Sequence, residues 1–122
     1  MLEIRQRLAS DDPTNSQAQR DLSLSLNKIG DVQLQLGNAE KALQAYQQDL
    51  EISQKLAIDD PTNSQVQRDL LVSYYRLGSI QKEPAIARQY YQQALAIAEK
   101  LAAQDPLHKT LQNELRFAEL GF

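Results

Sequence analysis

Apolar side chains recur at steps of three and four residues along most of the chain. A first run comprises Leu22, Leu26, Ile29, Val32 and Leu36. A second run, which includes one serine, comprises Ala39, Ala42, Leu43, Tyr46, Leu50, Ser53 and Leu56. This is the period of an amphipathic α-helix, and the strict alternation expected of a half-buried strand is missing. The pattern predicts helices near residues 2–10, 13–36, 39–58, 61–82, 84–104 and 106–119.

The chain contains an internal repeat. The segment DDPTNSQ begins at Asp11 and again at Asp59, and the same offset of 48 residues brings Gly30 onto Gly78. Beyond residue 87 the offset is 45, because the second copy lacks three residues between residues 81 and 87. Repeats of this length that contain two helices are typical of stacked α-solenoids.

Each copy of the repeat opens with an Asp-Pro pair, at Asp12–Pro13, Asp60–Pro61 and Asp105–Pro106. An Asp before a Pro is typical of a helix start, with the Asp as N-cap and the Pro as first helical residue. Paired Asp residues are also a feature of metal and acid–base sites, but a helix start already accounts for them here. We therefore interpret DDPTNSQ as a boundary between structural units. Gly37, in the segment LGN, is expected to end the preceding helix in a left-handed conformation.

These elements predict an all-α protein, an α-solenoid of stacked antiparallel helix pairs. Residues 1–122 are expected to form a single repeat domain, divided into a partial unit 1–12, a repeat 13–60, a repeat 61–105 and a C-terminal partial unit 106–122. Terminal solenoid units normally carry a polar cap. Apolar residues stand at the two ends instead, at Leu2, Ile4, Leu8, Leu115, Phe117, Leu120 and Phe122. We expect either that the natural protein continues past these ends or that copies of the chain stack into a homo-oligomer.

The repeat resembles the tetratricopeptide repeat, whose pattern runs W-x2-L-G-x2-Y, then A-x3-F, then P. The matching residues of the first unit are Leu26, Ile29, Gly30, Gln33, Ala42 and Tyr46. Those of the second unit are Tyr74, Leu77, Gly78, Gln81, Ala87 and Tyr91. We expect Gly30 and Gly78 to permit close approach of the paired helices, with Ala42 and Ala87 facing them.

The chain departs from the family pattern in two ways. Gln33 and Gln81 replace the second aromatic residue, and the unit exceeds the usual length of about 34 residues. The spacing around Pro61 assigns about seven extra residues, close to two turns, to each helix, so the buried face keeps its direction. Elongated repeats of this kind, with QRDL and GD segments, are similar to those of bacterial tetratricopeptide arrays.

The resemblance implies a non-catalytic scaffold that binds a protein or peptide on a concave face lined by the first helix of each pair. The residues implied for that face are Arg20, Leu24, Asn27, Asp31 and Gln35, and in the second copy Arg68, Val72, Tyr75, Ser79 and Lys82. Alternatively, Leu24, Val72 and Tyr75 complete the packing between neighbouring helices. The Lys and Asn clamp with which some relatives grip acidic chaperone tails is missing, because Asn27 and Asp31 occupy its positions.

Composition narrows the function further. A net charge of −3 and interspersed Lys and Arg residues argue against a nucleic-acid binder. Cys is absent, and the single His, His108, has no second ligand at metal spacing, so no cofactor, metal site or enzymatic activity is expected. No apolar run is long enough to cross a membrane and no export leader is evident. We expect a cytoplasmic protein.

Overall fold

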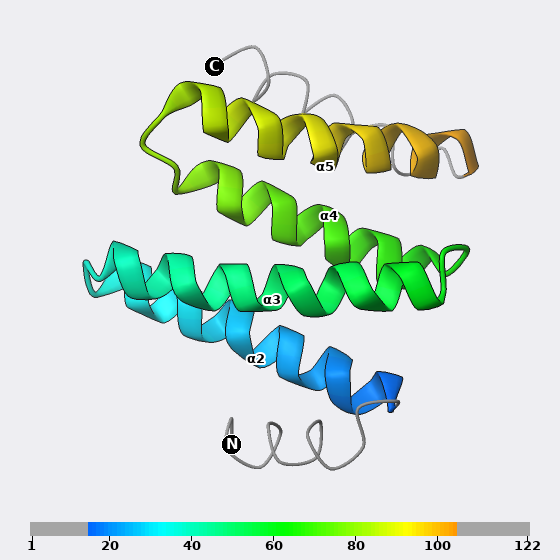
Figure 1. Ribbon diagram of the computed structural model, residues 1–122, viewed down its shortest axis with the longest axis horizontal. Coiled ribbons are helices and arrows are strands. Elements are labelled where there is room, and N and C mark those ends of the chain that lie inside the picture. Colours follow the sequence, from blue (N-terminus) through cyan, green and yellow to red (C-terminus); the bar gives the residue numbers. More distant parts are fainter. Residues whose placement is uncertain (1–14, 105–122) are drawn as a thin grey trace. The chain divides into compact units, whose positions relative to one another are not determined.

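The computed structural model describes residues 15–104, and these form four α-helices (Figure 1). The helices are α2 (Ser16–Gln35), α3 (Ala39–Asp59), α4 (Ser64–Ser79) and α5 (Pro84–Gln104). No strand occurs in this part of the chain, which confirms the predicted all-α class. The helices expected near residues 2–10 and 106–119, the apolar terminal residues and His108 lie outside the described residues.

The chain divides into two compact units, Met1–Pro61 and Thr62–Phe122. Within the first unit α2 and α3 pack against each other, and within the second α4 packs against α5. Figure 1 shows that the two helices of each pair run antiparallel. The division falls at the second copy of DDPTNSQ, so the boundary segment lies between the helix pairs.

The starts of α2 and α4 differ from the prediction, because Asn and not Asp is the capping residue. The third Asp-Pro pair, Asp105–Pro106, lies outside the described residues. The side chain of Asn15 accepts a hydrogen bond from the Ala18 amide at 3.0 Å, and α2 begins at Ser16. Asn63 does the same for α4 and accepts from two amides. Asp60 instead follows the end of α3, since a residue before Pro is disfavoured in the helical region. DDPTNSQ does separate one helix pair from the next at its second copy, but α2 and α4 begin three residues later than expected.

The two units end their first helices differently. Gly37 has a φ of 83°, the left-handed conformation expected of it, and residues 36–38 connect α2 to α3. The second unit has no glycine at this point. There α4 ends at Ser79 and residues 80–83 form the connection. The predicted helix over residues 61–82 is therefore too long at both ends. Because α4 is four residues shorter than α2 and its connection is one residue longer, the two together account for the three residues that the second copy lacks.

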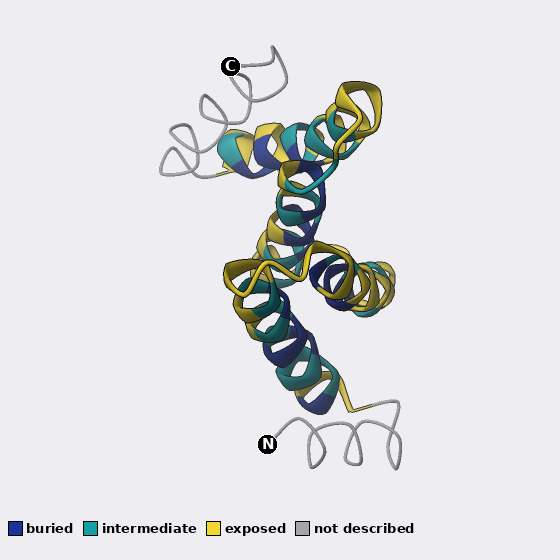
Figure 2. Ribbon diagram, turned by 90° about the vertical axis from the view of Figure 1, so that its left-hand side faces the viewer, coloured by how far each residue is buried: buried dark blue, intermediate teal, exposed yellow. Residues whose placement is uncertain are grey.

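The buried face of the first unit combines small, aromatic and polar side chains. Figure 2 shows the buried residues of the helices in dark blue. In α2 it contains Ser23, Leu26 and Gly30, and in α3 it contains Ala42, Ala45, Tyr46, Asp49, Ser53 and Leu56. The apolar run predicted as the core face of α2 lies only partly there. Val32 is 51% exposed and Leu36 is 68% exposed, whereas Leu26 is 4% exposed. The helical period was right, but the buried face is turned towards the positions of Ser23 and Gly30.

The buried contact between the two helices of the second unit is formed mainly by apolar side chains. Leu71 of α4 packs with Ala94, Ala98 and Leu101 of α5, each at most 2% exposed. Tyr74 and the side chains of Leu95 and Ile97 pack around this cluster. The close contact between α4 and α5 explains the small residues of α5, because alanine lets two helix backbones approach.

A glycine of the first helix lies against a tyrosine ring of the second helix in both units. A Cβ atom added to Gly30 would lie 2.6 Å from Cδ1 of Tyr46 and closer still to Cε1. One added to Gly78 would lie 2.8 Å from Cε1 of Tyr91. The expected close approach at the glycines is thus present, and the atoms nearest to each added Cβ belong to a tyrosine ring.

Candidate functional site

Four of the residues expected to bind a partner form one exposed stripe along α4. Arg68, Val72, Tyr75 and Ser79 follow one another at steps of three and four, so they share a face of the helix. All four are exposed, and Val72 and Tyr75 remain 37% and 42% accessible. A cationic group, an aliphatic side chain, a phenol and a hydroxyl therefore face solvent in a single row, which we call the α4 stripe.

The Tyr75 ring of the α4 stripe also packs within its own unit. Its centroid lies 5.5 Å from that of Tyr91 on α5, and the two rings are tilted by 51°. This contact supports the alternative that Tyr75 contributes to helix packing, yet much of its ring is still exposed. Burial, and to a smaller extent the neighbouring Tyr75, raises the pKa of the Tyr91 hydroxyl above its usual value of 10.

The corresponding residues of α2 are less exposed than expected. Arg20, Leu24, Asn27 and Asp31 are partly buried, and only Gln35, the last residue of the helix, is exposed. Asp31 accepts a hydrogen bond of 2.5 Å from the hydroxyl of Tyr46, so its carboxylate holds the core tyrosine in place. The buried Oδ1 of Asn27 accepts no hydrogen bond within the described part of the chain.

The last residue expected at the partner surface is displaced from the helix. Lys82 lies in the connection 80–83, because α4 ends three residues earlier. Its side chain is exposed but does not continue the α4 stripe. The structure therefore brings together Arg68, Val72, Tyr75 and Ser79, and it separates Lys82 from them.

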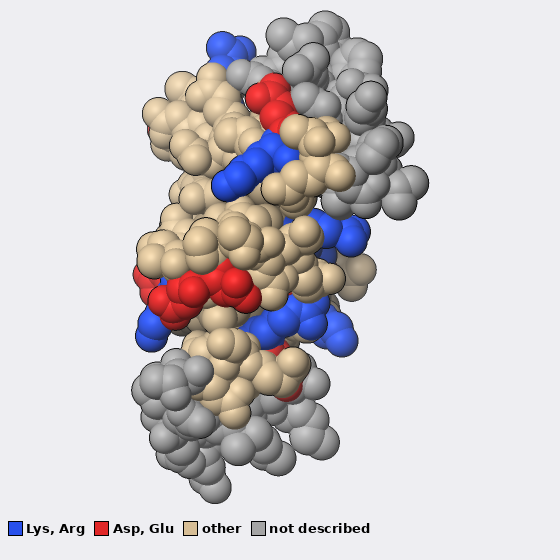
Figure 3. All heavy atoms as spheres, turned by 90° about the vertical axis from the view of Figure 1, so that its right-hand side faces the viewer, with Lys and Arg blue, Asp and Glu red and all other residues tan. Residues whose placement is uncertain are grey.

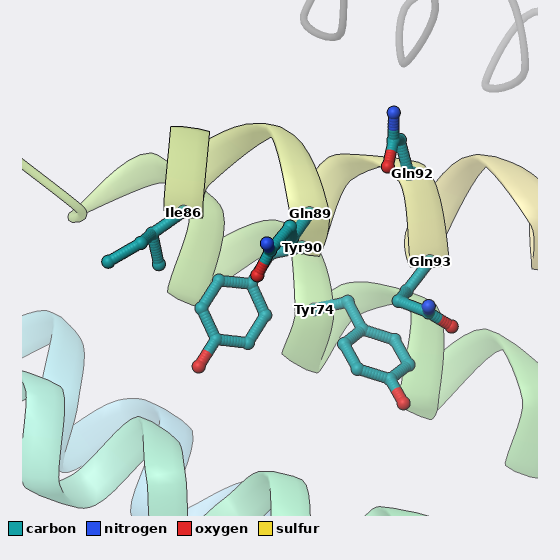
Figure 4. A pocket seen from close by; sticks show the side chains of 6 residues that line it. All are labelled: Tyr74, Ile86, Gln89, Tyr90, Gln92 and Gln93. Carbon is teal, nitrogen blue, oxygen red and sulfur yellow. The ribbon is translucent and has the colours of Figure 1, made fainter. Parts of the chain in front are cut away.

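A shallow hollow in the second unit was not anticipated from the sequence. It has a volume of about 440 Å³ and is lined by Tyr74 of α4 together with Ile86, Gln89, Tyr90, Gln92 and Gln93 of α5 (Figure 4). The ring centroids of Tyr74 and Tyr90 are 6.5 Å apart. The lining is uncharged, and Tyr90, which occupies the position of Ala45 in the first unit, is half-buried.

A buried polar cluster between α2 and α3 was also missed. The hydroxyl of Ser23 donates a short hydrogen bond to Oδ1 of Asp49, and Ser53 donates to the same oxygen at 3.3 Å. All three residues are at most 3% exposed. The available signal was positional, since Asp49 lies three residues after Tyr46 and four before Ser53 on the predicted core face of α3. Catalysis by a Ser–His–Asp arrangement would need a histidine, and residues 15–104 contain none.

Charged side chains form no extended patch of one sign on the face seen in Figure 3, where basic and acidic groups alternate with uncharged ones. Among the described residues, no cluster of three or more His, Cys, Asp or Glu side chains is arranged to hold a metal ion. None of the helices between residues 15 and 104 combines the length and the apolar character that a membrane span requires.

Comparison with known proteins supports the pattern of paired helices. A family model described as tetratricopeptide repeat matches residues 21–100, well over half of the chain. The matched segment includes most of α2 and α5 and all of α3 and α4. Searches of curated proteins and of solved structures gave no match.

Proposed function

The chain belongs to the tetratricopeptide repeat family, whose repeats generally mediate protein–protein interaction, and from this premise we propose that it is a non-catalytic scaffold that binds a protein or peptide through the α4 stripe. The observation that carries the proposal is the exposure of Val72 and Tyr75 beside Arg68 on one helix face. Truncation of tyrosine and arginine is usually costly when they lie at the centre of an interface.

The chemistry of the α4 stripe indicates what its partner presents. Val72 and Tyr75 offer an apolar surface to an aliphatic or aromatic side chain, and burying it removes apolar area from water. Arg68 lies one turn away and can pair with a carboxylate, while the hydroxyl of Ser79 lies one turn beyond Tyr75. We propose that the partner is a peptide segment that carries an apolar side chain and, beside it, an acidic residue. The partly buried residues of α2 have a smaller role in this proposal, and a cytoplasmic location remains part of it.

The test is a binding measurement with peptides selected against the intact chain from a random library. Their dissociation constants are measured by fluorescence anisotropy for the wild type and for the variant R68A/V72A/Y75A. We expect the variant to bind at least about tenfold more weakly, which corresponds to roughly 1.4 kcal/mol. Circular dichroism should show unchanged helical content, because these side chains lie outside the buried core.

The matched control changes an exposed apolar residue and an exposed arginine elsewhere. The variant I58A/R88A alters Ile58, which is 78% exposed on α3, and the exposed Arg88 of α5. It should bind as the wild type does. Equal affinities for the α4-stripe variant and the wild type would place the partner elsewhere, and unfolding of the α4-stripe variant would favour the packing role of Val72 and Tyr75.

A further inference from the structure

The two units differ at three equivalent positions of the contact between their helices. In the first unit these positions are polar and hydrogen-bonded, and in the second they are apolar. The equivalent pairs are Ser23 and Leu71, Asp49 and Ala94, and Ser53 and Ala98. All six side chains are at most 3% exposed, so the difference lies in the core and not on the surface.

The difference matters because α3 has two sequence neighbours that are nearly alike. It follows α2, which begins SQAQRDL, and it precedes α4, which begins SQVQRDL. Both connections are short, with residues 36–38 on one side of α3 and 60–63 on the other. Both neighbours also carry a glycine, Gly30 or Gly78, at the position that receives a tyrosine ring. The similar helix starts, the short connections and the glycine contact therefore do not decide which neighbour α3 takes as its partner.

We propose that the buried cluster of Ser23, Asp49 and Ser53 selects α2 over α4 as the helix that packs on the buried face of α3. The selection follows from hydrogen bonding. Ser23 supplies a hydroxyl donor to Asp49, whereas the equivalent Leu71 of α4 supplies none. Packing Leu71 onto Asp49 would bury the carboxylate with one donor fewer, and buried polar groups that lose a partner are costly.

The same cluster excludes the reverse error in the second unit. If α2 packed on α5, Ser23 would face Ala94 and Ala98, and its buried hydroxyl would lose the acceptor that Asp49 provides. Repeat proteins are prone to misassembly between similar units, and one buried polar contact can fix the register of otherwise interchangeable helices. The device acts on which helices pair, and it is independent of partner binding at the α4 stripe.

The test uses the full chain and makes the two contacts alike. The variant S23L/D49A/S53A gives the first unit the same three residues as the second. The readout is the nuclear Overhauser effect between the Tyr46 ring and the α-protons of Gly30 or Gly78. In refolded wild type we expect only the contact with Gly30. In the refolded variant we expect a second set of signals in which the Tyr46 ring contacts Gly78.

A second variant tests the same choice of partner by changing α4 instead of α2 and α3. L71S gives α4 a hydroxyl at the position of Ser23 and leaves the cluster itself intact, so it too should produce the contact between Tyr46 and Gly78. The exposed substitution S64A in α4 is the control and should show only the contact with Gly30. If S23L/D49A/S53A refolds with that contact alone, the proposal is wrong. Failure of this variant to fold would also overturn it, because the cluster would then supply stability rather than choice of partner.

Discussion

Replacing Gly30 by Ala sets two effects of known size against each other. Alanine in a helix interior is normally about 1 kcal/mol better than glycine. Here the new methyl group would lie 2.6 Å from Cδ1 of Tyr46, well inside the 3.5–4.0 Å at which carbon atoms attract. The ring cannot easily move aside, because Tyr46 is 2% exposed and its hydroxyl is bound to Asp31.

The clash should outweigh the gain in helix propensity. Overpacking a well-filled core costs about 1–3 kcal/mol, and here the added methyl group would have to displace a whole tyrosine ring. The measured cost of overpacking already includes part of the gain in helix propensity that a larger residue brings. We therefore expect Gly30→Ala to lower the free energy of unfolding by about 1–2 kcal/mol. Thermal unfolding followed by circular dichroism should show the melting temperature lowered by roughly 4 °C per kcal/mol.

The background in which the change is made separates the two effects. In a Tyr46→Ala chain the ring is gone, and Gly30→Ala should then stabilise by up to about 1 kcal/mol. Gly78→Ala in the second unit should cost less than Gly30→Ala, because the added atom would lie 2.8 Å from a ring that is only half-buried. A higher melting temperature for Gly30→Ala in the wild-type background would refute the reasoning from the close contact.

Three further predictions follow from the caps, the buried cluster and the tyrosine pair. Asn63→Ala should lower the free energy of unfolding by about 1 kcal/mol, whereas Asp60→Ala should have the smaller effect; urea denaturation measures both, and the reverse order would restore Asp60 as the cap. Ser23→Ala should cost about 1–3 kcal/mol in the same assay, because the buried carboxylate of Asp49 loses a donor, and a neutral result would contradict the hydrogen bond. The pKa of Tyr91 is raised in the folded chain, so its contribution to the free energy of unfolding is complete below about pH 10 and is lost as the pH rises further. The free energy of unfolding should therefore fall more steeply between about pH 9 and 11 for the wild type than for Tyr91→Phe. Parallel curves for the two proteins would contradict this prediction.

The sequence predicted the helical elements well where strong local signals coincide. The expected helix over residues 39–58 differs from α3 by one residue, and that over residues 84–104 coincides with α5. Gly37 lies just before the start of α3, and Pro84 is the first residue of α5. Both residues favour backbone conformations that other residues adopt less readily. At the helix starts two capping candidates compete within DDPTNSQ. The expectation favoured Asp-Pro, but the Asn side chain is the one that reaches the free amides.

The buried face was harder to predict because hydrophobicity alone does not define it. The apolar period of α2 pointed to Val32 and Leu36, which are exposed. The contact with α3 uses Ser23 and Gly30, one chosen for a hydrogen bond and the other for its lack of a side chain. Hydrophobicity does not predict the burial of Asp49, because a carboxylate is stable in the core only when groups from another segment form hydrogen bonds with it. The pattern of one helix does not contain that information.

The position of DDPTNSQ also has a genetic consequence. The first copy of the heptapeptide leads into α2 and the second lies where α3 ends and α4 begins. A recombination that joins the first copy to the second therefore removes 48 residues, which include α2 and α3 together. The reverse event inserts a complete pair. Neither event divides a helix from the partner that satisfies its buried groups, so Asp49 is lost or duplicated with Ser23 and Tyr46 with Gly30. The array can therefore change length in whole units, and each junction regenerates an Asn that caps the next helix.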